Sequence, residues 1–287
     1  MKARLLNQII WRSLSVWFYI HDGTLLRASR FRRKTSSRSL TSLPLVSVII
    51  PTHNRCDILV TRCLRSVLDQ SYVNLQILVC AHGCTDGTAV AVASLGDPRV
   101  EIIQVPRTSL GYPGIAENHW LVGPVRPLNA GTQAAKGEWI AVIGDDDEWT
   151  PDHIAHSLVY LSESRNEFVS SYSLKIDGVT APTVIGKDSY GRVHVGGVST
   201  WVYSAQLRYA KWNVNSWRKP WNRPNDIDFL LRLKRTGVRM GFSDHVGHVW
   251  SLRPDEGHLG SLAYQVDPNR YESLYELKPG SDASGTD

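Results

Sequence analysis

Short apolar runs alternate with helical patterns from residue 44 onward, and this alternation is the main feature of the chain. Residues 46–50, 75–80, 100–105 and 139–143 are predicted as strands. Helices are predicted over residues 56–70, 88–95, 127–135, 152–162 and 226–235. Strands and helices that alternate in this way form a parallel sheet covered by helices. The sequence therefore predicts an α/β fold, in which ligands bind at the carboxyl ends of the strands.

The first 43 residues differ in charge from the rest of the chain. They carry nine Lys and Arg residues and one acid, whereas the whole chain has a formal net charge of +5. Residues 5–20 are apolar and aromatic but too short and too polar to span a bilayer. Such a helix beside the basic run 27–38 can dock on an anionic membrane surface. The alternative is a helix packed on the body and followed by a solvated linker.

The composition is typical of a soluble globular protein. With 42% hydrophobic and 21% charged residues, the chain of 287 residues is long enough for one large α/β domain. Residues 44–287 are slightly acidic, so we expect no nucleic-acid partner. Four cysteines (Cys56, Cys63, Cys80 and Cys84) lack the context of a secreted disulfide framework, and their spacing fits no standard zinc knuckle. We therefore expect reduced thiols in a cytoplasmic protein.

Three consecutive carboxylates, Asp145, Asp146 and Asp147, follow the apolar run 139–143. Adjacent anions repel one another, so a cationic or strongly hydrogen-bonding group must lie opposite them. Carboxylate oxygens suit Mg²⁺ or Mn²⁺ that holds a diphosphate. The alternative is an ordinary acidic turn at the end of a strand.

Five segments at the ends of predicted elements resemble one family when taken in order. They are SVIIPTHNR (47–55), GCTDGT (83–88), RPLNAG (126–131), DDD (145–147) and PNDIDFLLRL (224–233). Each motif alone is modest, whereas five in this order are specific. The chain resembles the family 2 glycosyltransferases, which are inverting enzymes of the GT-A fold. The resemblance implies a Rossmann-like, mostly parallel sheet with flanking helices and a smaller acceptor-side region.

The same resemblance implies the domain organisation and the activity. Residues 44–260 are expected to form the glycosyltransferase domain, with a nucleotide-sugar half (44–150) and an acceptor half (151–260). Residues 1–43 precede it, and 261–287 form a C-terminal extension whose end is disordered. The implied reaction moves a sugar from a nucleotide-diphosphate sugar to a hydroxyl of a glycan or lipid-linked saccharide, with Mn²⁺ or Mg²⁺. We expect this chemistry in the cytoplasm, with peripheral contact on the inner face of the membrane.

Residues from several loops are implied to bind the nucleotide sugar: Pro51, Thr52, Asn54, Arg55, His82, Arg126 and Asp145. Thr52 or Asn54 would serve equally well as a helix N-cap, and Arg126 as an exposed arginine at a helix start. His82 stands where the family usually has the acid that holds uracil. UDP is therefore the expected nucleotide, with dTDP and GDP left open.

The implied metal ligands are Asp146 and His248, although a lone histidine is more often structural. Gly144 stands where the family has the first acid of its motif, so the roles of the next three acids are uncertain. Asp145 is expected to contact ribose or metal, and Asp147 to hold the shape of the turn.

Asp226 is the expected general base, because it matches the second acid of the family's Glu-Asp pair. The alternative is a helix cap. Asp228 is expected to pair with Arg232 four residues on. The expected acceptor contacts are Gly197, Trp201 and Asn225, where Asn225 replaces the family's Glu and core packing is the alternative for Trp201.

A catalytically silent module that binds nucleotide sugar or glycan is the alternative function. A nucleotidyltransferase is disfavoured, because residues 52–57 do not form the glycine-rich basic loop that such an enzyme needs after its first strand.

Overall fold

The computed structural model describes residues 43–108, 112–113, 116–186, 188–190, 193–218 and 224–251, together with seven residues between 13 and 27. The predictions for residues 261–287 and for most of residues 1–43 lie outside these ranges. None of the described helices has both the length and the apolar content needed to cross a bilayer.

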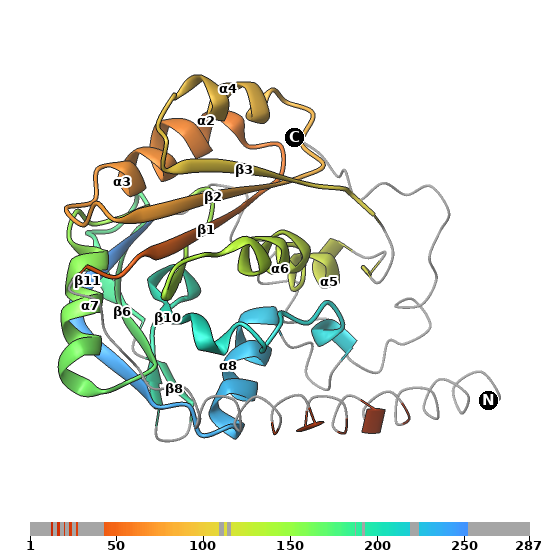
Figure 1. Ribbon diagram of the computed structural model, residues 1–287, viewed down its shortest axis with the longest axis vertical. Coiled ribbons are helices and arrows are strands. Elements are labelled where there is room, and N and C mark those ends of the chain that lie inside the picture. The colour runs from red at the N-terminus through yellow and green to blue at the C-terminus, as the bar shows by residue number, and fades with distance from the viewer. Residues whose placement is uncertain are drawn as a thin grey trace.

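A nine-stranded sheet forms the centre of the fold, in the order β3–β2–β1–β4–β10–β6–β11–β5 with β7 beside β6 (Figure 1). The strands β1 to β4 are parallel, and β10 joins β4 and β6 in antiparallel orientation. The strand bounds are β1 Val46–Thr52, β2 Leu75–His82, β3 Val100–Val105, β4 Trp139–Val142, β5 Glu148–Trp149, β6 Phe168–Ile176, β7 Thr183–Ile185, β10 Val202–Ser204 and β11 Met240–Ser251. A separate hairpin pairs β8 Asp188–Tyr190 with β9 Val193–Val195. The expected α/β fold is confirmed.

Helices cover both faces of the sheet. Their bounds are α2 Cys56–Ile58, η1 Leu59–Leu64, α3 Arg65–Leu68, α4 Thr88–Ser94, α5 Ala116–Trp120, α6 Val125–Ala134, α7 His153–Ser164 and α8 Asn225–Arg235, with short 3₁₀ turns η2 Val198–Thr200, η3 Ala205–Leu207 and η4 Ser216–Arg218. The single helix predicted over residues 56–70 is instead an α-helical, a π-helical and a second α-helical segment in succession. α2, α3 and α4 lie on one face of β1–β3, and α6 lies on the other (Figure 1).

Alternating side chains of β1 supply the two hydrophobic cores. Val48 and Ile50 pack with Leu59 under the first helices, whereas Ile49 packs with Leu128 of α6 on the opposite face. Gly131 allows α6 to approach the sheet closely, because a Cβ there would lie 2.5 Å from Ile49 Cγ2. This close packing fixes α6 over the carboxyl ends of the central strands.

The alternative role of Thr52 or Asn54 as N-cap of the first helix is not found. Neither Thr52 nor Asn54 caps it; the carboxylate of Asp86, from the loop after β2, accepts a hydrogen bond from Cys56 N at 2.8 Å. Asn54 has a φ of 50° and accepts a hydrogen bond from Thr85 N at 2.8 Å. The loops after β1 and β2 are therefore bound to each other by side chains.

His153, at the start of α7, makes the fold sensitive to acid. Its ring is fully buried 4.8 Å from Trp149, and both ring nitrogens lack a hydrogen-bond partner. Burial, followed by the nearby His245, His248 and His156, holds the pKa of His153 well below its usual value. Because the unfolded chain then takes up a proton near pH 6.5 and the folded chain does not, stability falls as the pH falls.

We expect the free energy of unfolding, measured with urea, to be lower at pH 5.5 than at pH 7.5. Replacing His153 by glutamine removes this titration and should make the pH dependence shallower. His156→Gln, at an exposed position of the same helix, is the control and should change it less. An unchanged pH dependence in His153→Gln would contradict the assignment.

Candidate functional site

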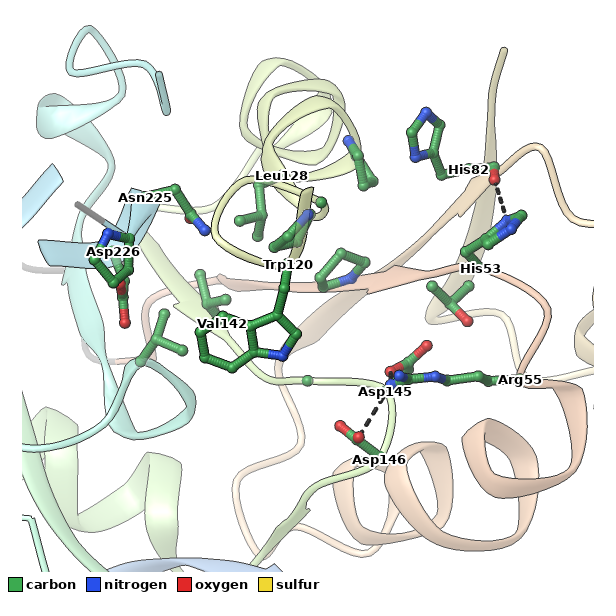
Figure 2. Close-up of a pocket in the computed structure, with 18 of the residues that line it drawn as sticks. His53, Arg55, His82, Trp120, Leu128, Val142, Asp145, Asp146, Asn225 and Asp226 are labelled. Carbon is green, nitrogen blue, oxygen red and sulfur yellow. Dashed lines mark hydrogen bonds and ion pairs between the residues drawn. The ribbon is translucent and has the colours of Figure 1, made fainter. Parts of the chain in front are cut away.

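A cavity of about 440 Å³ opens where the carboxyl ends of β1, β2 and β4 meet α5, α6 and the start of α8. Because these strands are neighbours in the sheet, the residues that follow them come together at one edge. The cavity is lined by Pro51, Thr52, His53, Arg55, His82, Trp120, Leu121, Gly123, Pro124, Pro127, Leu128, Val142, Gly144, Asp145, Asp146, Val198, Pro224, Asn225 and Asp226. Figure 2 shows Arg55 and the two acids at one end and Asp226 at the other.

Arg55 is the cationic group that lies opposite the acidic cluster. Its Nη1 donates to Asp145 Oδ1 and to Asp146 Oδ2, each at 2.9 Å. Burial raises the pKa of Asp145, and the charge of Arg55 opposes that shift. The expectation that adjacent carboxylates need a cationic partner is therefore confirmed, and the first turn after β1 supplies it.

Asp147 turns away from the cavity. Its carboxylate accepts a hydrogen bond from Ser199 Oγ and lies 3.1 Å from His248 Nε2. Burial alone would raise the pKa of Asp147, but His248 and Ser199 lower it. A Cβ at residue 144 would stand 2.8 Å from Asp147 Oδ2, so Gly144 leaves room for this inward turn.

His248 is placed differently from the prediction. Its ring is buried behind the acidic turn, where Nδ1 lies 2.8 Å from Ser173 Oγ, and it does not line the cavity. The cause is the parallel pairing of β11 with β6, which places His248 opposite Ser173.

The donor set for a cation consists of two carboxylates. Within the described ranges no three His, Cys, Asp or Glu side chains gather in a metal-binding arrangement. Asp145 and Asp146 present hard oxygen atoms to the cavity, and Mg²⁺ and Mn²⁺ sites often use one or two carboxylates together with phosphate oxygens. These residues fit a cation that is shared with a diphosphate.

His82 lines the end of the cavity near the first turn (Figure 2). Burial, with His53 and Arg107 nearby, lowers the pKa of His82 to about 4, so the imidazole is neutral at pH 7. His82 Nε2 is buried without a hydrogen-bond partner, while its carbonyl oxygen lies 2.7 Å from His53 Nδ1. An unpaired ring nitrogen at a cavity wall is suited to a polar ligand group.

Asp226 stands in the first turn of α8. Burial raises its pKa, which favours a carboxylate that can accept a proton. It is not the N-cap, which is Pro224, but its Oδ1 accepts a hydrogen bond from Ile227 N at 2.8 Å in the first turn of the helix. The expected ion pair of Asp228 with Arg232 is confirmed, since Arg232 Nε lies 2.8 Å from Asp228 Oδ2 in the buried interior.

Three other predicted residues do not line the cavity. Asn54 binds the loop after β2, and the Arg126 guanidinium lies over the Tyr112 ring, 5.5 Å from its centroid. Gly197 is the N-cap of η2, and its neighbour Val198 lines the cavity instead. The predicted ligand contacts of Asn54, Arg126 and Gly197 therefore have no support in this arrangement.

Trp201 is a core residue, and its expected acceptor role is wrong. It is 2% exposed, its Nε1 donates to Gly196 O at 2.8 Å, and its ring packs against Phe168, Trp212 and Phe229. An aromatic residue near glycines has the same sequence pattern whether it packs in a core or faces a ligand.

We expect Trp201→Ala to lower the free energy of unfolding by about 3–5 kcal/mol, because it opens a large cavity in this aromatic cluster. Chemical denaturation measures the change, and Trp120→Ala, at a partly exposed site, should cost less. A loss below that of Trp120→Ala would contradict the core assignment.

Sequence reasoning missed His53, Trp120 and the apolar wall of the cavity. Trp120 and Leu121 come from residues 107–124, where no regular period marks an element. A single tryptophan at the end of the five-residue helix α5 gives too little signal to be singled out without its neighbours in space.

Comparison with known proteins identifies the domain. Residues 47–187 match the family model described as glycosyl transferase family 2. The succinoglycan biosynthesis protein ExoO of Rhizobium meliloti is 32% identical over 40% of this chain and 29% of its own length. The Escherichia coli enzyme WfaP, named as a UDP-Glc:alpha-D-GlcNAc-diphosphoundecaprenol beta-1,3-glucosyltransferase, is 27% identical over 48% of this chain and 49% of its own length. The chain thus matches less than half of the length of these relatives.

Solved structures share the fold. Staphylococcus aureus TarS 1–349 in complex with UDP-GlcNAc has a TM-score of 0.57 at 18% identity, over 75% of this chain and 60% of that one. The mannosyltransferase PcManGT of Pyrobaculum calidifontis, in complex with GDP-Man and Mn²⁺, has a TM-score of 0.55 at 15% identity, over 88% and 72%. Residues 47–187 are therefore similar to glycosyl transferase family 2, and the solved structures show that the chain has a GT-A fold.

Proposed function

We propose that the chain is an inverting glycosyltransferase that moves a sugar from a nucleotide-diphosphate sugar, with UDP the expected nucleotide, to a hydroxyl of a glycan or lipid-linked saccharide. One observation carries the proposal: a single cavity has Asp145, Asp146 and Arg55 at one end and Asp226, with a raised pKa, at the other. The two ends provide for a diphosphate and for an acceptor hydroxyl. The named activity of the Escherichia coli relative WfaP supports the same class of reaction.

The donor end holds the leaving group. Asp145 and Asp146 would hold Mn²⁺ or Mg²⁺, which when bound neutralises charge on the diphosphate. Arg55 Nη1 lies 2.9 Å from each carboxylate. Its guanidinium is therefore close enough to pair with a phosphate bound at the same end of the cavity. His82, neutral and with an unpaired Nε2, supplies a hydrogen-bonding group for the nucleotide base.

The acceptor end activates the nucleophile. The acceptor hydroxyl attacks the anomeric carbon, its proton passes to Asp226, and the bond from that carbon to the diphosphate oxygen breaks with its electron pair on the phosphate. Because no carboxylate nucleophile takes part in this mechanism, one displacement inverts the anomeric configuration. Burial supports the role of Asp226, since a raised pKa makes its carboxylate a better proton acceptor.

The test is release of nucleoside diphosphate from UDP-glucose, UDP-GlcNAc, dTDP-glucose or GDP-mannose with Mn²⁺ and a panel of saccharide glycosides. The proposal expects one donor to release its nucleoside diphosphate faster when an acceptor is present. Binding of a donor without release in any mixture would instead favour the silent binding module.

Membrane contact by residues 1–43 stays a prediction. In the described part of this segment, Val16, Trp17 and Ile20 are more than half exposed, and Arg27 belongs to the basic run. Deleting residues 1–43 should abolish co-sedimentation with anionic phosphatidylserine vesicles and leave the melting transition of the body intact. Unchanged sedimentation would contradict the prediction.

A further inference from the structure

Trp120 lies at the cavity wall and is partly exposed. It is 37% exposed, whereas Trp139, Trp149, Trp201, Trp212 and Trp217 are at most 3% exposed. Figure 2 shows its indole between the pair Asp145 and Asp146 on one side and Asp226 on the other. A large, partly exposed apolar ring at the wall of a cavity that also holds carboxylates is the kind of surface that a ligand covers.

Asn225 fixes the backbone beside Trp120. Both its backbone N, at 3.0 Å, and its side-chain Nδ2, at 2.9 Å, donate to the carbonyl oxygen of Leu121. Asn225 is 8% exposed and directly precedes Asp226. A carboxylate at this position would have no proton to donate to that carbonyl. Asn225, which stands where the family that the sequence resembles has Glu, therefore makes a contact that a glutamate carboxylate could not make.

The turn after Trp120 is held by further hydrogen bonds. Gly123 N donates to His119 O at 2.7 Å, and Tyr112 Oη donates to Gly123 O at 3.1 Å. The Tyr112 ring is stacked on the His119 ring, with centroids 5.0 Å apart. These contacts, together with those of Asn225, preorganise the position of the indole relative to the start of α8.

We propose that Trp120 is the platform on which the acceptor sugar stacks, and that Asn225 is a positioning residue that holds this platform next to Asp226. The inference rests on the proposed function and names a sugar-binding residue for the same cavity. The apolar C–H face of a pyranose ring lies against the indole, and the hydroxyl at the ring edge reaches Asp226.

The acceptor sugar is favoured over the donor sugar by two observations. The segment that carries Trp120 is bound to the residue before the base, so the indole and Asp226 keep their relative positions. The groups that suit a diphosphate, Arg55 with Asp145 and Asp146, gather at the opposite end of the cavity.

The test measures saccharide and nucleotide binding separately on the full chain. An array of defined immobilised saccharides, probed with the wild-type protein in UDP and Mn²⁺, selects the saccharide that is retained best. Dissociation constants for that saccharide, for UDP and for UDP-glucose are then measured for Trp120→Phe, Trp120→Ala, Asn225→Ala, the double variant and Trp250→Ala. Trp250 is a half-buried tryptophan of β11 outside the cavity and is the matched control.

We expect Trp120→Ala to weaken saccharide binding about tenfold or more, as for other tryptophans at the centre of a binding site. Trp120→Phe should weaken it less, and UDP binding and the Trp250→Ala control should be unchanged. Asn225→Ala should weaken saccharide binding but add little in the Trp120→Ala background, because it acts through the indole.

Four outcomes would overturn the inference. Saccharide binding that is unchanged in Trp120→Ala would show that Trp120 is not the platform. A wild-type protein that binds UDP but retains no saccharide would show the same. Equal weakening of saccharide and UDP-sugar binding would assign the indole to the donor. A wild-type protein that binds neither nucleotide nor saccharide would refute the proposed function as well. Nucleotide binding by the wild type therefore distinguishes failure of this inference from failure of the proposed function.

Discussion

Replacing Asp226 by asparagine is expected to lower kcat by about 10²–10⁴-fold while leaving nucleotide-sugar binding unchanged. Asparagine keeps the shape of the side chain but cannot accept the proton of the acceptor hydroxyl. Because Asp226 lies at the opposite end of the cavity from Arg55, its loss should not disturb the contacts of the diphosphate. Initial rates of nucleoside diphosphate release and isothermal titration with the nucleotide sugar give the two quantities.

Asp228→Asn is the matched control on the same helix. Asp228 is fully buried and paired with Arg232, so its replacement breaks an internal ion pair rather than the chemistry. We expect it to lower stability by about 3–5 kcal/mol. An Asp226→Asn variant that loses donor binding, or one that keeps the wild-type rate, would show that Asp226 is not the base.

Replacing Asp146 by asparagine should remove most of the Mn²⁺-dependent part of nucleotide binding. The variant loses one of the two carboxylates at the donor end of the cavity, while Arg55 keeps its contact with Asp145. Removing one charged partner from a buried polar contact costs about 2–5 kcal/mol, which corresponds to more than about tenfold in Kd. Titration of the nucleotide with and without Mn²⁺ measures the change.

Asp147→Asn separates this effect from a general disturbance of the acidic turn. The Asp147 carboxylate contacts Ser199 and His248 and does not line the cavity. Its replacement should lower stability but keep the response to Mn²⁺. Equal loss of the Mn²⁺ response in Asp146→Asn and Asp147→Asn would contradict the assignment of Asp146 as a ligand.

The strands β1, β2 and β4 could be predicted because they are buried on both faces and are mostly apolar, whereas β3 is a partly exposed edge strand that alternates less regularly. β3 spans residues 100–105, as predicted, and β1 and β2 each extend two residues beyond their apolar runs. The polar residues at those extensions, Thr52 and His82, face the cavity. At the edge of the sheet that lines the cavity, the strands therefore continue for two polar residues beyond the apolar runs that predict them.

Residues whose partners lie far away in the chain could not be placed from the sequence. The first helix is capped by Asp86, 30 residues downstream of Cys56. His248 is buried against Ser173 and Asp147 because β11 pairs with β6. A local pattern contains no information about such contacts, which is why the alternative caps are not found and the predicted place of His248 was wrong.

Aromatic residues were the least predictable part of the site. Trp201 lies in a glycine-containing segment and packs in the core, whereas Trp120 ends the short helix α5 and faces the cavity. The difference arises from burial by Phe168, Trp212 and Phe229, which belong to three other segments of the chain. Only the tertiary packing separates a core tryptophan from one at a binding surface.

The thermal unfolding midpoint of the full chain in UDP, dTDP, GDP, ADP or CMP, each with and without Mn²⁺, tests most directly whether the cavity is a nucleotide-sugar site. A ligand at about 100 times its Kd stabilises the folded state by about 2.7 kcal/mol, and each kcal/mol raises the midpoint by about 2–4 °C. We predict that one nucleoside diphosphate raises the midpoint and that Mn²⁺ is needed for the full shift. A midpoint unchanged by every nucleotide, with and without Mn²⁺, would contradict the account.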